Sequence, residues 1–193
     1  MALPILKDGV PVVHPARAAI EMATTYGTEI GLVAACGVLH GERATLTELR
    51  AVAEEATRWS GSLTTRLVLA RADARLTNVA EIRTWHLFHE QRVPRPVPQV
   101  AVYDEDGNLL GIVDFLWEEL GVFLEFDGRI KYLYHRLPGE SVDDYVLREK
   151  RRAEQICVAK RWICIRITWA DLQRPAVLAK RVRRALESRA HAA

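Results

Sequence analysis

Apolar residues up to Leu76 recur every three or four positions, which is the spacing of amphipathic helices. Pro15 begins the first such stretch, at the helical position where proline is favoured, and Thr28 begins a second stretch that is apolar nearly all round. Further helices are predicted over 45–59 and 62–76. The pattern therefore predicts a helical N-terminal part.

From Asn78 on the pattern is different: it predicts a helix, then three short apolar runs, a second helix, a fourth apolar run and a last helix. The segment RVPRPVP ends the first of these helices, because prolines at alternate positions force an extended backbone. Turn signals such as DEDGN separate the apolar runs, which is typical of strands. We expect helices over 79–91, 143–160 and 176–187, and strands over 99–103, 109–116, 122–127 and 162–168.

This order of elements predicts an α/β (α+β) fold, in which a helical part precedes an α-β-β-β-α-β core. A helical crossover returns the fourth strand to the sheet, so we expect a mixed four-stranded sheet flanked by helices. Two domains follow from this division, a helical one over 1–77 and a second one over 78–193.

Composition narrows the class of protein. The chain has 193 residues, of which 49% are hydrophobic, and this supports a full core. Its three cysteines form no C-x-x-C pair, which excludes a disulfide framework and a cysteine-rich zinc site and suits a cytoplasmic protein. No apolar run is long enough to span a membrane, and residues 1–10 lack the pattern of a secretion signal. We therefore expect no membrane partner.

Charge is segregated along the chain although the net charge is only +2. Residues 104–145 hold eleven acidic and three basic side chains, whereas residues 148–193 hold thirteen basic and four acidic ones. One interpretation is a phosphate-binding rim around a metal-binding pocket. The other is that both regions have ordinary solvated faces, and charge alone favours this second interpretation.

Three carboxylates lie on or beside the two central strands. Asp114 is embedded in the apolar run GIVDFLW, where a charge is costly unless it is paired or binds a metal. Glu125 and Asp127 share one face of the next strand, because side chains alternate along a strand. If the two strands pair as a hairpin, Asp114 comes opposite or diagonal to Glu125. Three carboxylates would then converge into an oxygen-rich site of the kind that Mg²⁺ prefers.

Lys131 follows six residues after Glu125 and can reach the same place from the end of the strand. Two simpler alternatives remain open. Asp127 and Gly128 can simply form a turn with no role in a metal site. Glu125 can be ion-paired with an arginine of the basic helix.

Three strings of this sequence carry a resemblance to a known family: GIVDFLWEELGVFLEFDGRIKY, VLREKRRAEQI and WICIRITWADL. Together they resemble the PD-(D/E)XK nuclease superfamily, and more closely the very-short-patch-repair-like endonuclease domain common in actinobacterial proteins. The resemblance covers residues 78–187. The helical part before it is similar to the middle of AbiEi-type antitoxins of type IV toxin–antitoxin systems.

The resemblance implies a metal-dependent endonuclease that hydrolyses DNA phosphodiester bonds, in phage defence or DNA repair. Asp114 and Glu125 match the family's ligands for Mg²⁺, with Mn²⁺ as an alternative, and Glu81 matches an acidic residue that completes the metal shell. Asp127 stands where the superfamily usually has lysine, so either it or Lys131 would orient the attacking water. The implied nucleic-acid-binding residues are Gln99, Arg148, Lys150, Arg151 and Arg152.

A non-catalytic regulator on a nuclease fold, antitoxin-like or DNA-binding, is the alternative function. The retained acids Asp114 and Glu125 favour the enzyme, and so does the lack of a winged helix-turn-helix, which a repressor would need. A toxin or another protein partner could bind through residues 1–77. The oligomeric state stays open, with a homodimer as one option.

Overall fold

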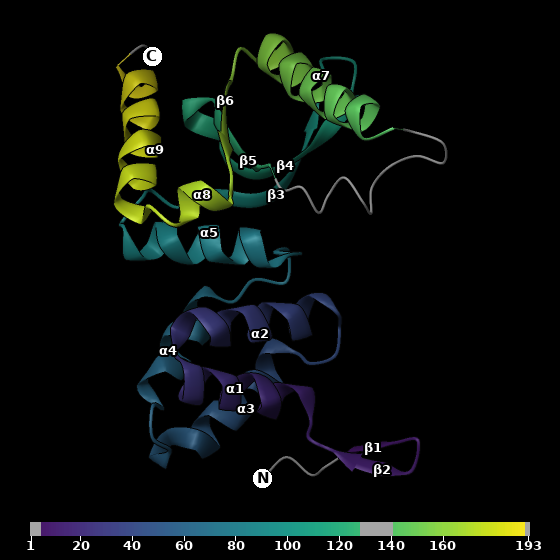
Figure 1. The fold of residues 1–193 in the computed structure, drawn as a ribbon, viewed down its shortest axis with the longest axis vertical. Coiled ribbons are helices and arrows are strands. Elements are labelled where there is room, and N and C mark those ends of the chain that lie inside the picture. Colours follow the sequence, from purple (N-terminus) through teal and green to yellow (C-terminus); the bar gives the residue numbers. More distant parts are fainter. Residues whose placement is uncertain (1–4, 128–140, 192–193) are drawn as a thin grey trace. The chain divides into compact units, whose positions relative to one another are not determined.

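A computed structural model describes residues 5–127 and 141–191 of the chain (Figure 1). The chain divides into two compact units, Met1–His86 and Leu87–Ala193, and the boundary falls inside helix α5 (Val79–Glu90). The described residues combine eight α-helices with a two-stranded and a four-stranded sheet, so the α/β class is confirmed. No helix in the described ranges is long and apolar enough to cross a membrane.

The first unit is a set of packed helices preceded by a small antiparallel hairpin, and the expected helical N-terminal part is confirmed. The helix expected over 62–76 ends at Arg71 rather than Leu76. The helix expected over 45–59 ends earlier and is followed by a short 3-10 helix. The elements are β1 (Ile5–Lys7), β2 (Val10–Val12), α1 (Pro15–Tyr26), α2 (Thr28–His40), α3 (Leu46–Glu55), η1 (Ala56–Arg58) and α4 (Leu63–Arg71).

The hairpin β1–β2 is absent from the sequence-based prediction, because strands of three residues are too short to show an alternating pattern. Its signal is the dipeptide Asp8-Gly9, whose φ angles are 52° and 80°. Positive φ at both central residues is the requirement of a type I′ hairpin turn, which Asp-Gly satisfies well.

Helices α1 and α2 pack without space for a side chain at Gly31. A Cβ added there would lie 2.4 Å from the Cβ of Ala23. Gly31→Ala is therefore expected to lower the free energy of unfolding by about 1–3 kcal/mol through overpacking, as measured by urea denaturation. Gly37 of the same helix has nothing within 4 Å of such a Cβ, so Gly37→Ala is the matched control. It should raise stability by up to about 1 kcal/mol, and equal effects of the two substitutions would contradict this packing.

The second unit contains the expected mixed four-stranded sheet. Its strand order is β3-β4-β5-β6, with antiparallel β3–β4 and β4–β5 pairs and a parallel β5–β6 pair. With α5 this makes the predicted α-β-β-β-α-β order. Among the described residues of this unit, the short helix α8, capped by Thr168 and Asp171, and the 3-10 helix η2 were not predicted. The elements are β3 (Val97–Tyr103), β4 (Leu109–Trp117), η2 (Glu118–Leu120), β5 (Val122–Phe126), α7 (Val142–Lys160), β6 (Ile163–Ile167), α8 (Trp169–Leu172) and α9 (Pro175–Ala190).

Helix α7 covers one face of this sheet (Figure 1). The core on that side consists of Val102, Val113, Leu116, Phe123, Ala153 and Ile156. On the other face, Phe88 packs edge-on against Phe115, with ring centroids 5.8 Å apart, and Phe126 packs in the same way against Trp169. The sheet is thus buried on both faces, so a charged residue within β4 or β5 needs a polar partner.

Candidate functional site

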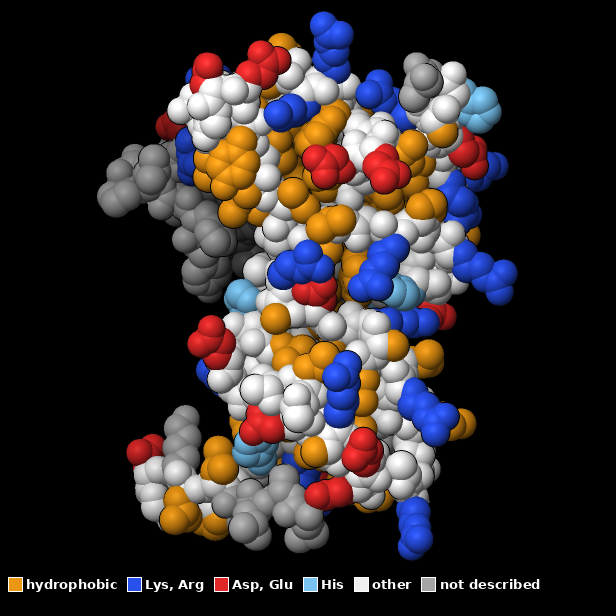
Figure 2. Space-filling model, turned by 180° about the vertical axis from the view of Figure 1, so that it is seen from behind, with side chains coloured by type: hydrophobic (Ala, Val, Ile, Leu, Met, Phe, Trp, Pro, Cys, Tyr) orange, Lys and Arg blue, Asp and Glu red, His pale blue; other side chains and the backbone are white. Residues whose placement is uncertain are grey.

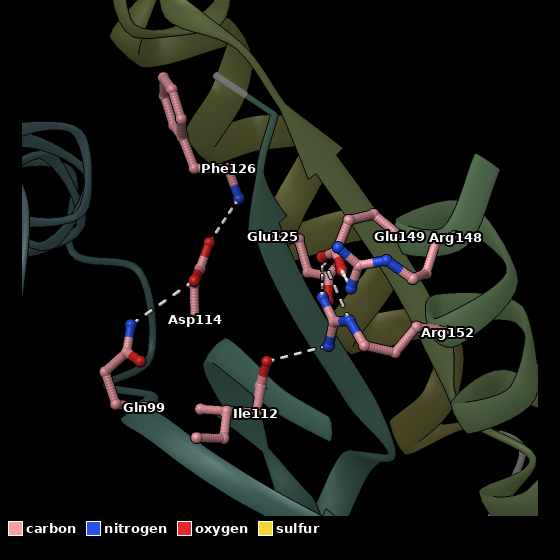
Figure 3. Close-up of polar contacts among 8 residues, drawn as sticks. All are labelled: Gln99, Ile112, Asp114, Glu125, Phe126, Arg148, Glu149 and Arg152. Atoms are coloured by element: carbon pink, nitrogen blue, oxygen red, sulfur yellow. Dashed lines mark hydrogen bonds and ion pairs between the residues drawn. The ribbon is translucent and has the colours of Figure 1, made fainter. Parts of the chain in front are cut away.

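Asp114 lies at the point where strands β4 and β5 separate. The ladder between them ends at the pair Phe115 and Leu124, and the next two positions are Asp114 and Glu125. Beyond this pair, the backbone N–H of Phe126 donates to the Asp114 carboxylate and not to a main-chain carbonyl, with 2.7 Å between Phe126 N and Asp114 Oδ2 (Figure 3). Asp114 is only 7% exposed, so this N–H donor compensates part of the cost of burying its charge.

Gln99 approaches Asp114 from strand β3, which lies on the other side of β4 from β5. The pairs Pro98–Phe115 and Val100–Val113 flank the position where Gln99 faces Asp114. Here the backbone of Gln99 is left-handed, with φ of 53°, and its Nε2 lies 3.5 Å from Asp114 Oδ1 (Figure 3). Left-handed backbone at a non-glycine residue costs about 1–3 kcal/mol, and such strain concentrates at functional sites. The structure thus places Gln99 beside one of the expected acidic residues, Asp114.

Glu125 is buried in β5, with 9% of its surface exposed, and is turned toward α7 (Figure 3). Its Oε1 accepts a hydrogen bond from Arg152 Nη2 at 2.7 Å. Burial raises the pKa of the Glu125 carboxyl, the Arg152 charge opposes this increase, and the nearby negative charge of Asp114 adds to it. The two carboxylates are thus close enough to interact, and the ion pair that sequence reasoning left open is present.

Arg152 is fixed by three neighbours at once. Besides Glu125, it contacts Glu149 Oε2 at 3.0 Å through Nη2 and donates from Nη1 to the carbonyl oxygen of Ile112 at 3.0 Å. A Cβ at Gly111 would lie 2.8 Å from Nη1 and 2.9 Å from Cδ, so this approach requires glycine. Sequence reasoning identified neither Glu149 nor Gly111 as part of the site. The three-residue spacing of Glu149 and Arg152, a common helical ion pair, was the available signal.

The expected convergence of three carboxylates is not found. Among the residues that the structure describes, no three His, Cys, Asp or Glu side chains form a group able to hold a metal ion. Strand β5 ends at Phe126, one residue earlier than predicted, so Asp127 lies beyond the strand and is exposed. Its backbone N–H donates to the carbonyl oxygen of Ile167 at 2.7 Å. Lys131 lies outside the described residues.

Glu81 belongs to the first unit, where it caps the start of α5. Its carboxylate accepts hydrogen bonds from Thr77 N at 2.9 Å and from Asn78 Nδ2, while Asn78 Oδ1 accepts one from Glu81 N at 3.0 Å. Asn78 Oδ1 thus caps the N-terminus of α5, while the Glu81 carboxylate reaches back to Thr77 N, one residue before the N–H that a capping box would use. The pattern Asn78-x-x-Glu81 was the sequence signal of this cap. These bonds explain the burial of Glu81 without a metal ion.

The four basic residues expected on α7 do not share one direction. Arg152 is turned inward, whereas Lys150 and Arg151 are exposed, and Arg148 Nη1 lies 3.6 Å from Glu149 Oε1. Three arginines of α9 donate hydrogen bonds to backbone carbonyl oxygens, which occupies part of their capacity to bind phosphate: Arg181 to Arg166 O, Arg183 to Gln91 O and Arg189 to Leu120 O. Figure 2 shows Lys and Arg side chains spread over the drawn face with Asp and Glu among them. The described basic residues on this face therefore form no continuous rim.

We found no match to this chain among protein-family models, curated proteins or solved structures. Mg²⁺ is typically bound by one or two carboxylates together with waters and substrate phosphate, so a third carboxylate is not required. Asp114 and Glu125 are hard oxygen donors on adjacent strands. The donor set fits a divalent cation.

Proposed function

We propose that this protein is a metal-dependent endonuclease that hydrolyses DNA phosphodiester bonds in the cytoplasm, in phage defence or DNA repair. One observation carries the proposal. Two buried carboxylates, Asp114 and Glu125, occupy the first positions beyond the end of the β4–β5 ladder, and Gln99 reaches Asp114 from β3. The resemblance to PD-(D/E)XK nucleases supports this proposal, as does the α-β-β-β-α-β order of the second unit.

In this proposal Asp114 and Glu125 hold Mg²⁺ or Mn²⁺. The cation would supply Lewis-acid activation of water and neutralise charge developing on the phosphate. The N–H of Phe126 and the amide of Gln99 hold the Asp114 carboxylate in place for this task. The attacking water would be oriented by Asp127 or Lys131.

The exposed residues of α7 would bind the DNA backbone in this proposal. Arg148, Lys150 and Arg151 contact phosphates without reading base sequence, because a phosphate contact carries no sequence information. Such contacts are released by salt, so binding should weaken steeply as the ionic strength increases.

Plasmid nicking in Mg²⁺, Mn²⁺ or EDTA tests the proposal, with the wild type compared with Asp114→Ala and Glu125→Ala. We expect cleavage that depends on the metal and is lost in both variants. Cleavage that survives both substitutions would place the activity elsewhere and refute the assignment of these residues.

A second candidate, a non-catalytic DNA-binding or antitoxin-like regulator, is favoured by one feature. Arg152 already balances the charge of Glu125 without a cation. This candidate predicts no cleavage in any metal but a salt-sensitive shift of DNA in a gel. The helical residues 1–77 would then bind a toxin or another protein, which co-purification would detect.

A further inference from the structure

The guanidinium of Arg152 lies where a cation would bind Glu125. Its Nη2 is 2.7 Å from Glu125 Oε1, and the side chains of the two residues are only 22% and 12% exposed. An ion pair shielded in this way is weakened by solvent far less than a surface pair. A divalent cation and the guanidinium therefore require the same carboxylate oxygen.

The position of Arg152 is built by the fold and does not result from a flexible surface side chain. Glu149, one turn earlier on α7, holds Nη2 and Nε from the helix side, at 3.0 and 3.2 Å. The carbonyl of Ile112 holds Nη1 from the β4 side, and the missing side chain of Gly111 leaves the necessary space. Strand β4 and helix α7 thus direct one positive charge at Glu125 of β5.

We infer that Arg152 is an internal competitor of the divalent cation: its guanidinium neutralises Glu125 in the metal-free protein and must withdraw for the cation to bind. This role differs from the phosphate contact that the family resemblance implies for Arg152. The inference rests on the metal site of the proposed function. It means that the metal affinity of this site is set by the strength of the Arg152–Glu125 pair.

The inference is tested by metal affinity alone, with Mn²⁺ as the probe. Unbound Mn²⁺ is quantified from its electron paramagnetic resonance signal, without DNA, for the wild type and Arg152→Met. We expect Arg152→Met to bind Mn²⁺ about tenfold more tightly, because the like-charged competitor is gone and two adjacent carboxylates attract the ion. Arg184→Met removes an exposed arginine of α9 and is the matched control for net charge, with wild-type affinity expected.

Arg152→Lys is the second variant, since it keeps the charge but cannot bind Glu125, Glu149 and Ile112 O together. Its affinity should lie between those of the wild type and Arg152→Met. If Arg152→Met does not fold, Arg152→Lys decides, and affinity equal to or below that of the wild type overturns the inference. The same result for Arg152→Met overturns it directly.

The two proposals fail in distinguishable ways. If Arg152→Met binds Mn²⁺ more tightly but the wild type cleaves no DNA, the competitor role stands and the nuclease function falls. If cleavage is metal-dependent and Arg152→Met has wild-type affinity, only the competitor role falls. If neither protein binds Mn²⁺, both are overturned.

Discussion

Asp114→Asn is expected to reduce metal-dependent cleavage at least about 100-fold, because a metal ion contributes several kcal/mol to transition-state stabilisation and the amide is a poor ligand for it. The same substitution should leave the free energy of unfolding nearly unchanged. Asparagine is isosteric, and its carbonyl oxygen can still accept the hydrogen bond from Phe126 N. The side-chain amide of Gln99 can turn over so that its oxygen accepts from the new NH2 group. Nicking rates and urea denaturation curves measure the two effects.

Asp114→Ala separates the chemical role of this residue from its structural role. Alanine leaves the buried N–H of Phe126 without its 2.7 Å acceptor, so stability should fall by about 1–3 kcal/mol as well. Asp106→Asn, in the exposed turn between β3 and β4, controls for the loss of one negative charge and should keep full activity. An Asp114→Asn protein that cleaves at the wild-type rate would exclude Asp114 as a metal ligand.

Arg152→Met is expected to lower the free energy of unfolding in metal-free buffer by about 3 kcal/mol, the usual cost of leaving one partner of a buried ion pair uncompensated. The cause is the Glu125 carboxylate, which would remain buried beside the charge of Asp114. Urea denaturation in EDTA measures the change. Because burial raises the pKa of Glu125, the native state holds its proton to higher pH than the unfolded state. The loss of stability should therefore grow as the pH increases through that pKa.

The double variant with Glu125→Gln is the control for this mechanism. It removes the uncompensated charge, so it should recover most of the stability that Arg152→Met loses. Arg184→Met, at an exposed position of α9, should change stability by less than about 0.5 kcal/mol. If the double variant is as unstable as Arg152→Met, the loss comes from packing of the long side chain and not from its charge.

Most of the second unit could be predicted because its signals are local. The prolines just before and at the start of β3, the turn residues between β3 and β4, and the short apolar runs each dictate a backbone conformation within a few residues. The errors are at positions where local signals are weak. The hairpin β1–β2 is too short to alternate, and the sequence places the end of β5 at Asp127, one residue beyond its end at Phe126.

The candidate site was predictable only in part. An aspartate inside GIVDFLW and a glutamate inside VFLEFD are conspicuous because charges in apolar strands need a partner. Their neighbours along the chain do not reveal that partner. Arg152 reaches Glu125 from a helix 27 positions later, through space that Gly111 leaves, and such a contact has no signal in local periodicity.

By itself, the sequence determined the helical first part, the α-β-β-β-α-β order and the two buried acids, because hydrophobic period, turn chemistry and the cost of buried charge act on short segments. The tertiary structure decided which charges meet. It pairs Glu125 with Arg152, leaves Asp127 exposed beyond β5 and uses Glu81 to cap a helix. These outcomes depend on strand register and on the placement of α7 against the sheet, since electrostatic contacts act over a few ångströms between segments far apart in the chain.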